Sequence, residues 1–155
     1  MSKIYKINEL KIENYKFKII TLLKQSFLKS YPNSIIEEEQ FVDRYNKLKE
    51  YLNQNAIVYG CFESDNLIGF VWFFEKNEMG LRLIHINQIV VDNAYRGQGI
   101  GTMLLNKTEE YCYLNKIDEI ELIVTDSNKQ AVEFYNNKDF YTERLIMKKK
   151  FDYDN

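Results

Sequence analysis

The chain has 155 residues, of which 45% are hydrophobic and 28% are charged, and its formal net charge is −2. These values suit one domain over residues 1–155, and the small net charge gives no reason to expect a nucleic-acid or membrane partner. The two cysteines lack metal or redox spacing and there is a single histidine. We therefore expect no metal, reduced thiols and a cytoplasmic location.

The N-terminal third is predicted to hold one strand and two helices. The alternation in "KIYKINEL" indicates a strand over residues 3–10. A helix is expected from a cap at Asn14 to about Ser30, because apolar residues recur there at helical spacing. Ser34 and Glu37 have the spacing of a capping box, which predicts the start of a second helix.

The remainder alternates between strand and helix patterns. Residues 56–64 and 67–76 are rich in β-branched and aromatic side chains, and the "SDN" between them predicts a hairpin turn. Further strands are expected at 81–92, 118–125 and 144–153, with helices at 101–115 and 127–140. The order β-α-α-β-β-β-α-β-α-β predicts an α/β fold of the α+β type, with a mixed, mostly antiparallel sheet flanked by helices.

Three of the six glycines, Gly97, Gly99 and Gly101, lie in "RGQGIG" between a predicted strand and a predicted helix. The first amides of a helix have no partner inside it, and the helix dipole adds positive potential, so an anion can bind there. Glycine would let a phosphate come close, while Arg96 would add charge and Thr102 a hydroxyl group. The spacing fits neither the P-loop nor the dinucleotide fingerprint. From the residues alone, the segment is either a structural turn or a phosphate loop.

The segment resembles the pyrophosphate-binding signature of the GNAT acetyltransferases, Arg/Gln-x-x-Gly-x-Gly/Ala, which reads here as Arg96, Gly99 and Gly101. "VVDNAYRGQGIG", the downstream "SNKQAVEFYNNKDF" and the element order are also similar to that family. The resemblance implies an N-acetyltransferase that moves an acetyl group from acetyl-CoA to a primary amine. The residues that it implies for acetyl-CoA binding are Ile89, Val90, Val91, Arg96, Gly97, Gln98, Gly99, Ile100, Gly101, Thr102, Asn128 and Tyr135.

The resemblance also implies catalytic roles. The backbone of residues 89–91 would pair with the pantetheine arm, and Tyr135 would donate a hydrogen bond to the leaving thiolate. The family's usual glutamate base is missing from "HINQIVV", where His85 and Asn87 lie at positions that resemble two histidines of serotonin N-acetyltransferase. His85 is therefore the candidate base. The alternatives are water relays from three glutamates: Glu75, Glu78 and Glu121.

The sequence is compatible with more than one acceptor and more than one function. The favoured acceptor is a small amine such as a polyamine, an aminoglycoside or an arylalkylamine, but a protein N-terminus or lysine is an alternative. A second alternative is an acyl-CoA-binding module without catalysis, because the usual carboxylate base is missing. Asn128 is equally explained as a helix cap. Neither Cys61 nor Cys112 has a histidine paired with it in the sequence pattern, so we expect direct transfer. Exposed edge strands near the C-terminus would favour a homodimer.

Overall fold

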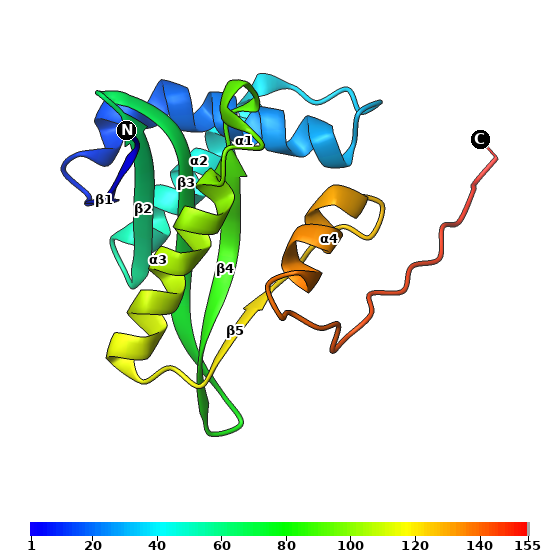
Figure 1. Cartoon of the computed structure of the whole chain (residues 1–155). Helices are drawn as coiled ribbons and strands as arrows, with labels where there is room; N and C mark the ends of the chain where they lie inside the picture. The colour runs from blue at the N-terminus through cyan, green and yellow to red at the C-terminus, as the bar shows by residue number, and fades with distance from the viewer. Residues whose placement is uncertain (155) are drawn as a thin grey trace. The chain divides into compact units, whose positions relative to one another are not determined.

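The computed structural model describes residues 1–154 and divides the chain into two compact units, Met1–Ile123 and Val124–Asn155. The first unit contains a five-stranded sheet in the order β1-β2-β3-β4-β5 (Figure 1). Four strands are antiparallel neighbours: β1 (Lys3–Ile7), β2 (Ala56–Glu63), β3 (Asn66–Glu78) and β4 (Leu81–Val91). β5 (Glu119–Leu122) runs parallel to β4, which confirms the mixed, mostly antiparallel sheet.

Helices cover both faces of this sheet. α1 (Lys16–Ser30) and α2 (Glu38–Leu52) lie behind it in Figure 1, and α3 (Ile100–Asn115) lies in front. Helix α2 buries Phe41, Tyr45, Leu48 and Leu52, a spacing that places all four on one side of the helix. Strand β3 is covered on both faces and is buried continuously over residues 67–73, which explains why its apolar run does not alternate.

Two predicted helix caps are wrong. Asn14 lies inside a short 3-10 helix, η1 (Ile12–Tyr15), which leads directly into α1. The chain is already helical when α1 begins, so its first amides bond to the preceding turn, as Lys16 N–H does to the carbonyl of Glu13. Helix α2 begins at Glu38 without a side-chain cap. Ser34 is too far from that start to cap it and instead bonds through its amide to the carbonyl of Tyr31.

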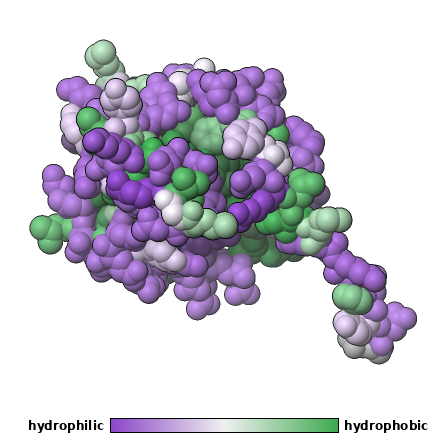
Figure 2. Space-filling model, turned by 90° about the horizontal axis from the view of Figure 1, so that it is seen from below, coloured by the Kyte–Doolittle hydropathy of each residue, from purple (hydrophilic) through white to green (hydrophobic). Residues whose placement is uncertain are grey.

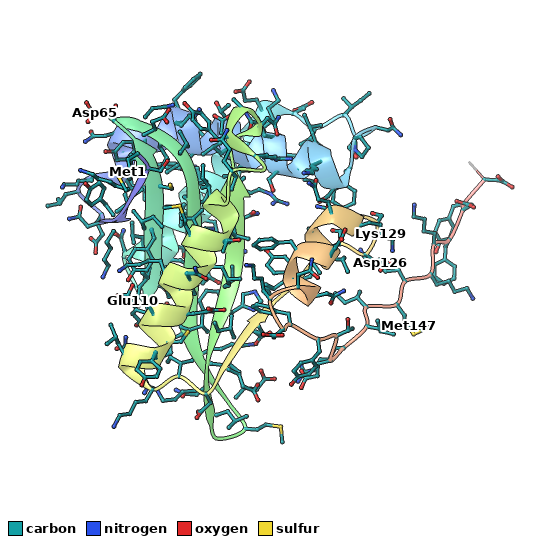
Figure 3. The ribbon with its side chains drawn as sticks, in the orientation of Figure 1. Met1, Asp65, Glu110, Asp126, Lys129 and Met147 are labelled. Carbon is teal, nitrogen blue, oxygen red and sulfur yellow. The ribbon has the colours of Figure 1, made fainter. Side chains whose placement is uncertain are left out.

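Over residues 124–154 the second unit contains one helix, α4 (Lys129–Asn136). The side chain of Asn128 accepts a hydrogen bond from the amide of Ala131 at 3.3 Å, which confirms Asn128 as the cap. Lys129 and Asp126, labelled in Figure 3, form an ion pair of 3.1 Å at the start of this helix.

The predicted last strand, over residues 144–153, is wrong. Residues 141–154 have no regular secondary structure and their side chains are exposed; Met147, labelled in Figure 3, is one of them. A strand forms only when a neighbouring strand pairs with its amides and carbonyls, so a β-like composition alone does not make one.

Hydrophilic residues cover most of the face drawn in Figure 2, with hydrophobic residues scattered among them. Within the described part of the chain, no helix combines the length and the apolar character needed to cross a membrane.

Candidate active site

Strand β4 has a free edge over its second half. The pairing of β4 with β5 ends at Ile86 and Leu122. Residues 87–91 continue β4 beyond that point, and among the described residues no strand pairs with them on the β5 side. A free strand edge offers amides and carbonyls to an extended ligand. The predicted cofactor residues Ile89, Val90 and Val91 all lie on this edge, although Val90 turns its side chain into the core.

A β-bulge lies where the free edge begins. Trp72 of β3 pairs with Gln88, but the next residue, Phe73, pairs with Ile86, so Asn87 is an extra residue. The bulge reverses the alternation of side chains along β4. His85 pairs with Phe74, and its ring lies 5.3 Å from the Phe74 ring, on the face that packs against α1 and α2.

Gln88 shares the regular pairing face of His85, because it pairs with Trp72 as His85 pairs with Phe74. A regular strand would place His85 and Asn87 on one face. Because the bulge adds one residue, the partner of Trp72 on that face is Gln88, and Asn87 is exposed. The likeness of His85 and Asn87 to two histidines of a related enzyme stays a prediction, and the bulge adds Gln88 to the face of His85.

The glycine loop connects the end of β4 to α3. Gly97 and Gly99 have φ angles of +75° and +80°, in the left-handed region that L side chains rarely adopt. A Cβ added at either would meet no atom within 4 Å, so the space above both is open. Gly99 precedes α3, and the first bond inside the helix runs from Met103 N–H to the carbonyl of Gly99 at 3.0 Å. The amides of residues 100–102 therefore lie in the first turn, where no intrahelical acceptor exists.

The remaining loop residues differ in what they present. Ile100 buries its side chain, so only its backbone can serve a ligand. Gly101 and Thr102 are half-buried in the first turn of α3, and Gln98 is exposed. The predicted loop residues thus lie together around one helix start.

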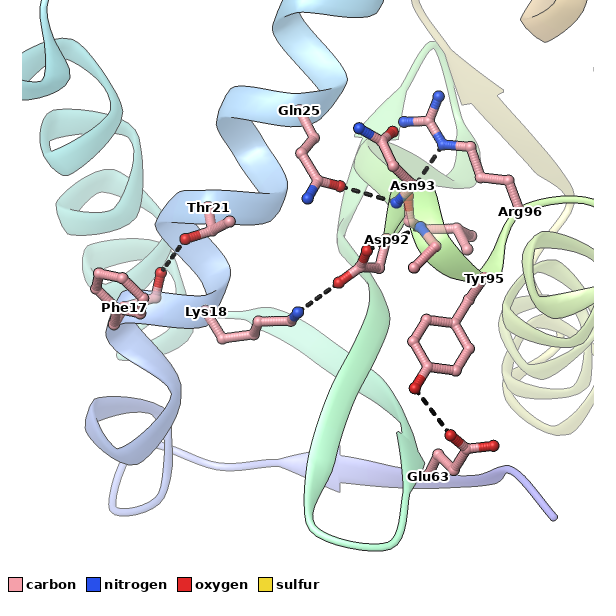
Figure 4. A network of polar contacts seen from close by, with 11 residues as sticks. Phe17, Lys18, Thr21, Gln25, Glu63, Asp92, Asn93, Tyr95 and Arg96 are labelled. Carbon is pink, nitrogen blue, oxygen red and sulfur yellow. Dashed lines mark hydrogen bonds and ion pairs between the residues drawn. The ribbon is translucent and has the colours of Figure 1, made fainter.

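Polar contacts with α1 hold this loop in place (Figure 4). Lys18 forms an ion pair with Asp92, whose carboxylate also accepts from the amide of Ala94 at 3.0 Å. Gln25 accepts a hydrogen bond from the amide of Asn93 at 2.9 Å. Burial alone would raise the pKa of Asp92, but the hydrogen bonds from Lys18 and Ala94 overcome it and hold that pKa below the usual value. This support could not be predicted from sequence patterns, because its partners lie far apart along the chain.

Arg96 folds back over the end of β4. Its Nε donates to the carbonyl of Val91 at 3.2 Å. Burial lowers the pKa of Arg96, and the nearby Asp92 opposes that change. The guanidinium group lies beside a hollow of about 430 Å³ between α1 and the loop.

His85 and Glu121 meet where β4 and β5 separate. They are opposite each other in the parallel ladder, one pair before it ends. Nδ1 of His85 lies 3.4 Å from Oε2 of Glu121, and Lys76 Nζ lies 2.6 Å from the other carboxylate oxygen. Burial would raise the pKa of Glu121, but Lys76 and then His85 outweigh it, so that pKa is lowered and the group is a carboxylate at neutral pH.

The other two candidate glutamates are engaged elsewhere. Glu75 binds Arg82 at 2.7 Å, and Arg82 also donates to the carbonyl of Asn115 at the end of α3. Glu78 lies 3.3 Å from Lys76, at the far end of the β3–β4 hairpin from the glycine loop. Glu121 is the glutamate whose carboxylate lies beside the His85 ring.

Neither cysteine is suited to carry an acetyl group. Cys61 and Cys112 are both buried. Burial raises the pKa of Cys61 and raises that of Cys112 to about 11, so both are protonated thiols at neutral pH. Within residues 1–154 no group of three or more His, Cys, Asp or Glu side chains could hold a metal ion.

Tyr135 belongs to the second unit, on α4. Its ring contacts the rings of Phe134 and Phe140, with centroids 5.2 and 5.5 Å away. Burial raises the pKa of Tyr135 above its usual value, so its hydroxyl group is a hydrogen-bond donor throughout the neutral range.

Comparison with known proteins assigns the family. The sequence model of the acetyltransferase (GNAT) family matches residues 20–140. The uncharacterized protein YxbD of Bacillus subtilis is 33% identical over 100 residues, which are 61% of this chain and 63% of YxbD. The thialysine N-epsilon-acetyltransferase of Bos taurus is 31% identical over 70 residues, which are 44% of this chain and 41% of that enzyme. The chain thus spans less than two thirds of these curated relatives.

A solved structure shows the same fold. An acetyl transferase candidate from Pyrococcus furiosus superposes with a TM-score of 0.77 and 27% identity, covering 97% of this chain and 100% of that one. The family model, the fold and the glycine loop after β4 lead to one assignment. This chain belongs to the GNAT acetyltransferase family.

Proposed function

We propose that this protein is an N-acetyltransferase that moves an acetyl group from acetyl-CoA directly to the primary amine of a small molecule. One observation carries the proposal. The free edge of β4 runs from the His85–Glu121 pair, where the strands separate, to the open glycine loop at the start of α3. An extended thioester with a phosphate group at its far end suits that path.

The chain's own groups would hold the cosubstrate at three places. Amides of the first turn of α3 would bind the pyrophosphate, because Gly97 and Gly99 leave that space open. Backbone groups of residues 87–91 would pair with the pantetheine arm, as an added strand pairs with a sheet edge. Oxyanion stabilisation is assigned to a backbone amide near Val91.

His85 is the proposed base. An alkylammonium group with a pKa near 10.4 must lose a proton before it attacks, which costs about 4.6 kcal/mol at pH 7. The Glu121 carboxylate beside Nδ1 would fix the tautomer that leaves Nε2 free to accept this proton. It would also stabilise the imidazolium ion that forms.

Tyr135 is the proposed partner of the leaving thiolate. Its raised pKa makes full proton transfer to a thiolate more costly than it would be for an ordinary phenol. A hydrogen bond that strengthens in the transition state is therefore its role. Direct transfer is supported by the two buried, protonated thiols, which offer no thiolate for a covalent intermediate.

The proposed acceptor class rests on the relatives. The thialysine N-epsilon-acetyltransferase is named for a small molecule with a primary amine. Acetylation of protein N-termini or lysines is the runner-up acceptor class. A non-catalytic acyl-CoA-binding role is disfavoured by the His85–Glu121 pair, because binding alone requires no such pair.

Release of free thiol from acetyl-CoA tests this function. The panel would contain thialysine, a polyamine, an aminoglycoside, an arylalkylamine and a peptide with a free N-terminus. Turnover with a small amine that falls strongly in His85→Gln supports the proposal. Tight binding of acetyl-CoA without turnover on any amine refutes the enzyme, and turnover confined to the peptide refutes the acceptor class.

A further inference from the structure

A basic hollow lies next to the glycine loop. It has a volume of about 430 Å³ and is bounded by α1 and by the loop that follows β4. Lys24 and Lys29 line it from α1, and Arg96 lines it from the loop. The three cationic side chains therefore converge on one space from two elements that lie far apart along the chain.

The protein balances this positive charge only in part, through Asp92 near Arg96. No residue that lines the hollow is acidic. Among the described residues neither Lys24 nor Lys29 forms an ion pair, and the nearby carboxylate of Asp92 is bound by Lys18. Burial and the charge of Arg96 both lower the pKa of Lys29, as expected where like charges approach each other. An anion in the hollow would relieve this repulsion.

Arg96 also connects the hollow to the loop. Its side chain lines the hollow, and its backbone is adjacent to Gly97, one of the two glycines with open space above them. Two anion-binding regions, the first turn of α3 and the hollow, are thus adjacent. A ligand with two separate phosphate groups suits them better than a single phosphate does. Coenzyme A carries a pyrophosphate and a phosphomonoester on its ribose.

We propose that Lys24, Lys29 and Arg96 bind the ribose phosphomonoester of coenzyme A, and that this hollow selects coenzyme A over its dephosphorylated form. The inference rests on the proposed use of acetyl-CoA. A phosphomonoester carries about two negative charges at neutral pH and three acceptor oxygens, and each lysine supplies three donors. The hollow also leaves room for the ribose that carries the phosphate.

The position of the hollow argues against a second possible ligand, an acidic group on a small acceptor. The acceptor amine must reach His85, six residues before the end of β4. At about 3.3 Å per residue, that end lies about 20 Å from His85, and the hollow is lined by residues of the loop beyond it. A small amine does not span this distance, whereas an extended cosubstrate does.

Calorimetric titration with coenzyme A and with dephospho-coenzyme A tests the inference. The test variant is Lys24→Gln with Lys29→Gln. The matched control is Lys6→Gln with Lys47→Gln, which removes the same charge from two exposed lysines outside the hollow. Thermal unfolding of both variants checks that the fold is retained.

We expect the wild type to bind coenzyme A on the order of tenfold more tightly than the dephosphorylated form. The test variant should lose this preference while its affinity for dephospho-coenzyme A stays within about twofold of the wild type. The control should keep the preference. A wild type without preference, or a test variant that retains it, overturns the inference but leaves the proposed function intact. A wild type that binds neither ligand overturns the proposed use of acetyl-CoA, and the inference with it.

Discussion

Replacing Glu121 by glutamine tests the proposed catalytic pair directly. The substitution keeps the shape of the side chain and removes its charge. Glu121 Oε2 lies 3.4 Å from Nδ1 of His85. At this distance two unit charges interact by about 1 kcal/mol in water and by about 5 kcal/mol at an effective dielectric constant of 20. The Glu121 side chain is 37% exposed and also binds Lys76, so the lower end applies.

We therefore expect Glu121→Gln to destabilise the imidazolium ion by about 1–2 kcal/mol and to lower kcat about 5- to 30-fold. The assay is steady-state thiol release at saturating acetyl-CoA and amine, with the Michaelis constant for acetyl-CoA as a second readout. That constant should change little, because Glu121 lies at the opposite end of the free edge from the glycine loop.

Glu75→Gln is the matched control. Glu75 binds Arg82 near the end of α3, and among the described residues it forms no ion pair with His85. Its loss removes the same charge from the same sheet, and kcat should stay within about twofold. An unchanged kcat in Glu121→Gln, or an equal fall in Glu75→Gln, would refute the assignment of Glu121 as the partner of the base.

Four further changes have expected outcomes. Tyr135→Phe should lower kcat about tenfold or more and leave the Michaelis constant for acetyl-CoA nearly unchanged in steady-state assays; an unchanged kcat would contradict its role at the thiolate. Gly99→Glu should abolish coenzyme A binding in calorimetry while circular dichroism stays native, because it strains a φ of +80° and brings a carboxylate to the start of α3; retained affinity would remove the loop from the site. Gly69→Ala should destabilise the fold by about 1–3 kcal/mol in urea unfolding, because its Cβ would lie 2.8 Å from a β4 carbonyl oxygen. An unchanged free energy of unfolding would mean that the β4 backbone shifts to make room. Lys18→Met leaves Asp92 without its cation and should lower the free energy of unfolding. This loss should be full above about pH 4, where the carboxylate is ionised in the unfolded chain too, and it should shrink as acid protonates Asp92 through its lowered folded pKa. A loss that is independent of pH in urea unfolding would point to packing alone.

Much of the fold could be predicted because periodicity reports burial. Buried residues spaced by three or four positions indicate a helix that packs one side against the rest of the protein. Helix α2 has this spacing at Phe41, Tyr45, Leu48 and Leu52. The failed prediction of a strand at 144–153 has the opposite cause. Those residues have strand-like composition, but pairing with a neighbour is a property of the assembled sheet and cannot be read from one segment.

The candidate site was predicted in parts. The loop could be located because left-handed φ angles demand glycine, and glycine is visible in the sequence. The contact between His85 and Glu121 could not be, because it depends on how two parallel strands are aligned. The bulge at Asn87 was equally hidden, and it reverses the assignment of faces downstream. Contacts that depend on strand register therefore cannot be predicted from the sequence alone.

At Gly97 and Gly99 the loop before α3 has a backbone conformation that distinguishes L from D side chains. At Gly97 and Gly99 the obstacle to a side chain is the left-handed backbone and not a lack of room. A D-alanine prefers that backbone, whereas an L-alanine opposes it. A semisynthetic protein with D-alanine at position 97 should thus have a higher free energy of unfolding than the natural chain, because D-alanine leaves the unfolded state less freedom than glycine does. Glycine, which is achiral, thus takes positions in this loop that would suit D-amino acids, which the ribosome does not incorporate.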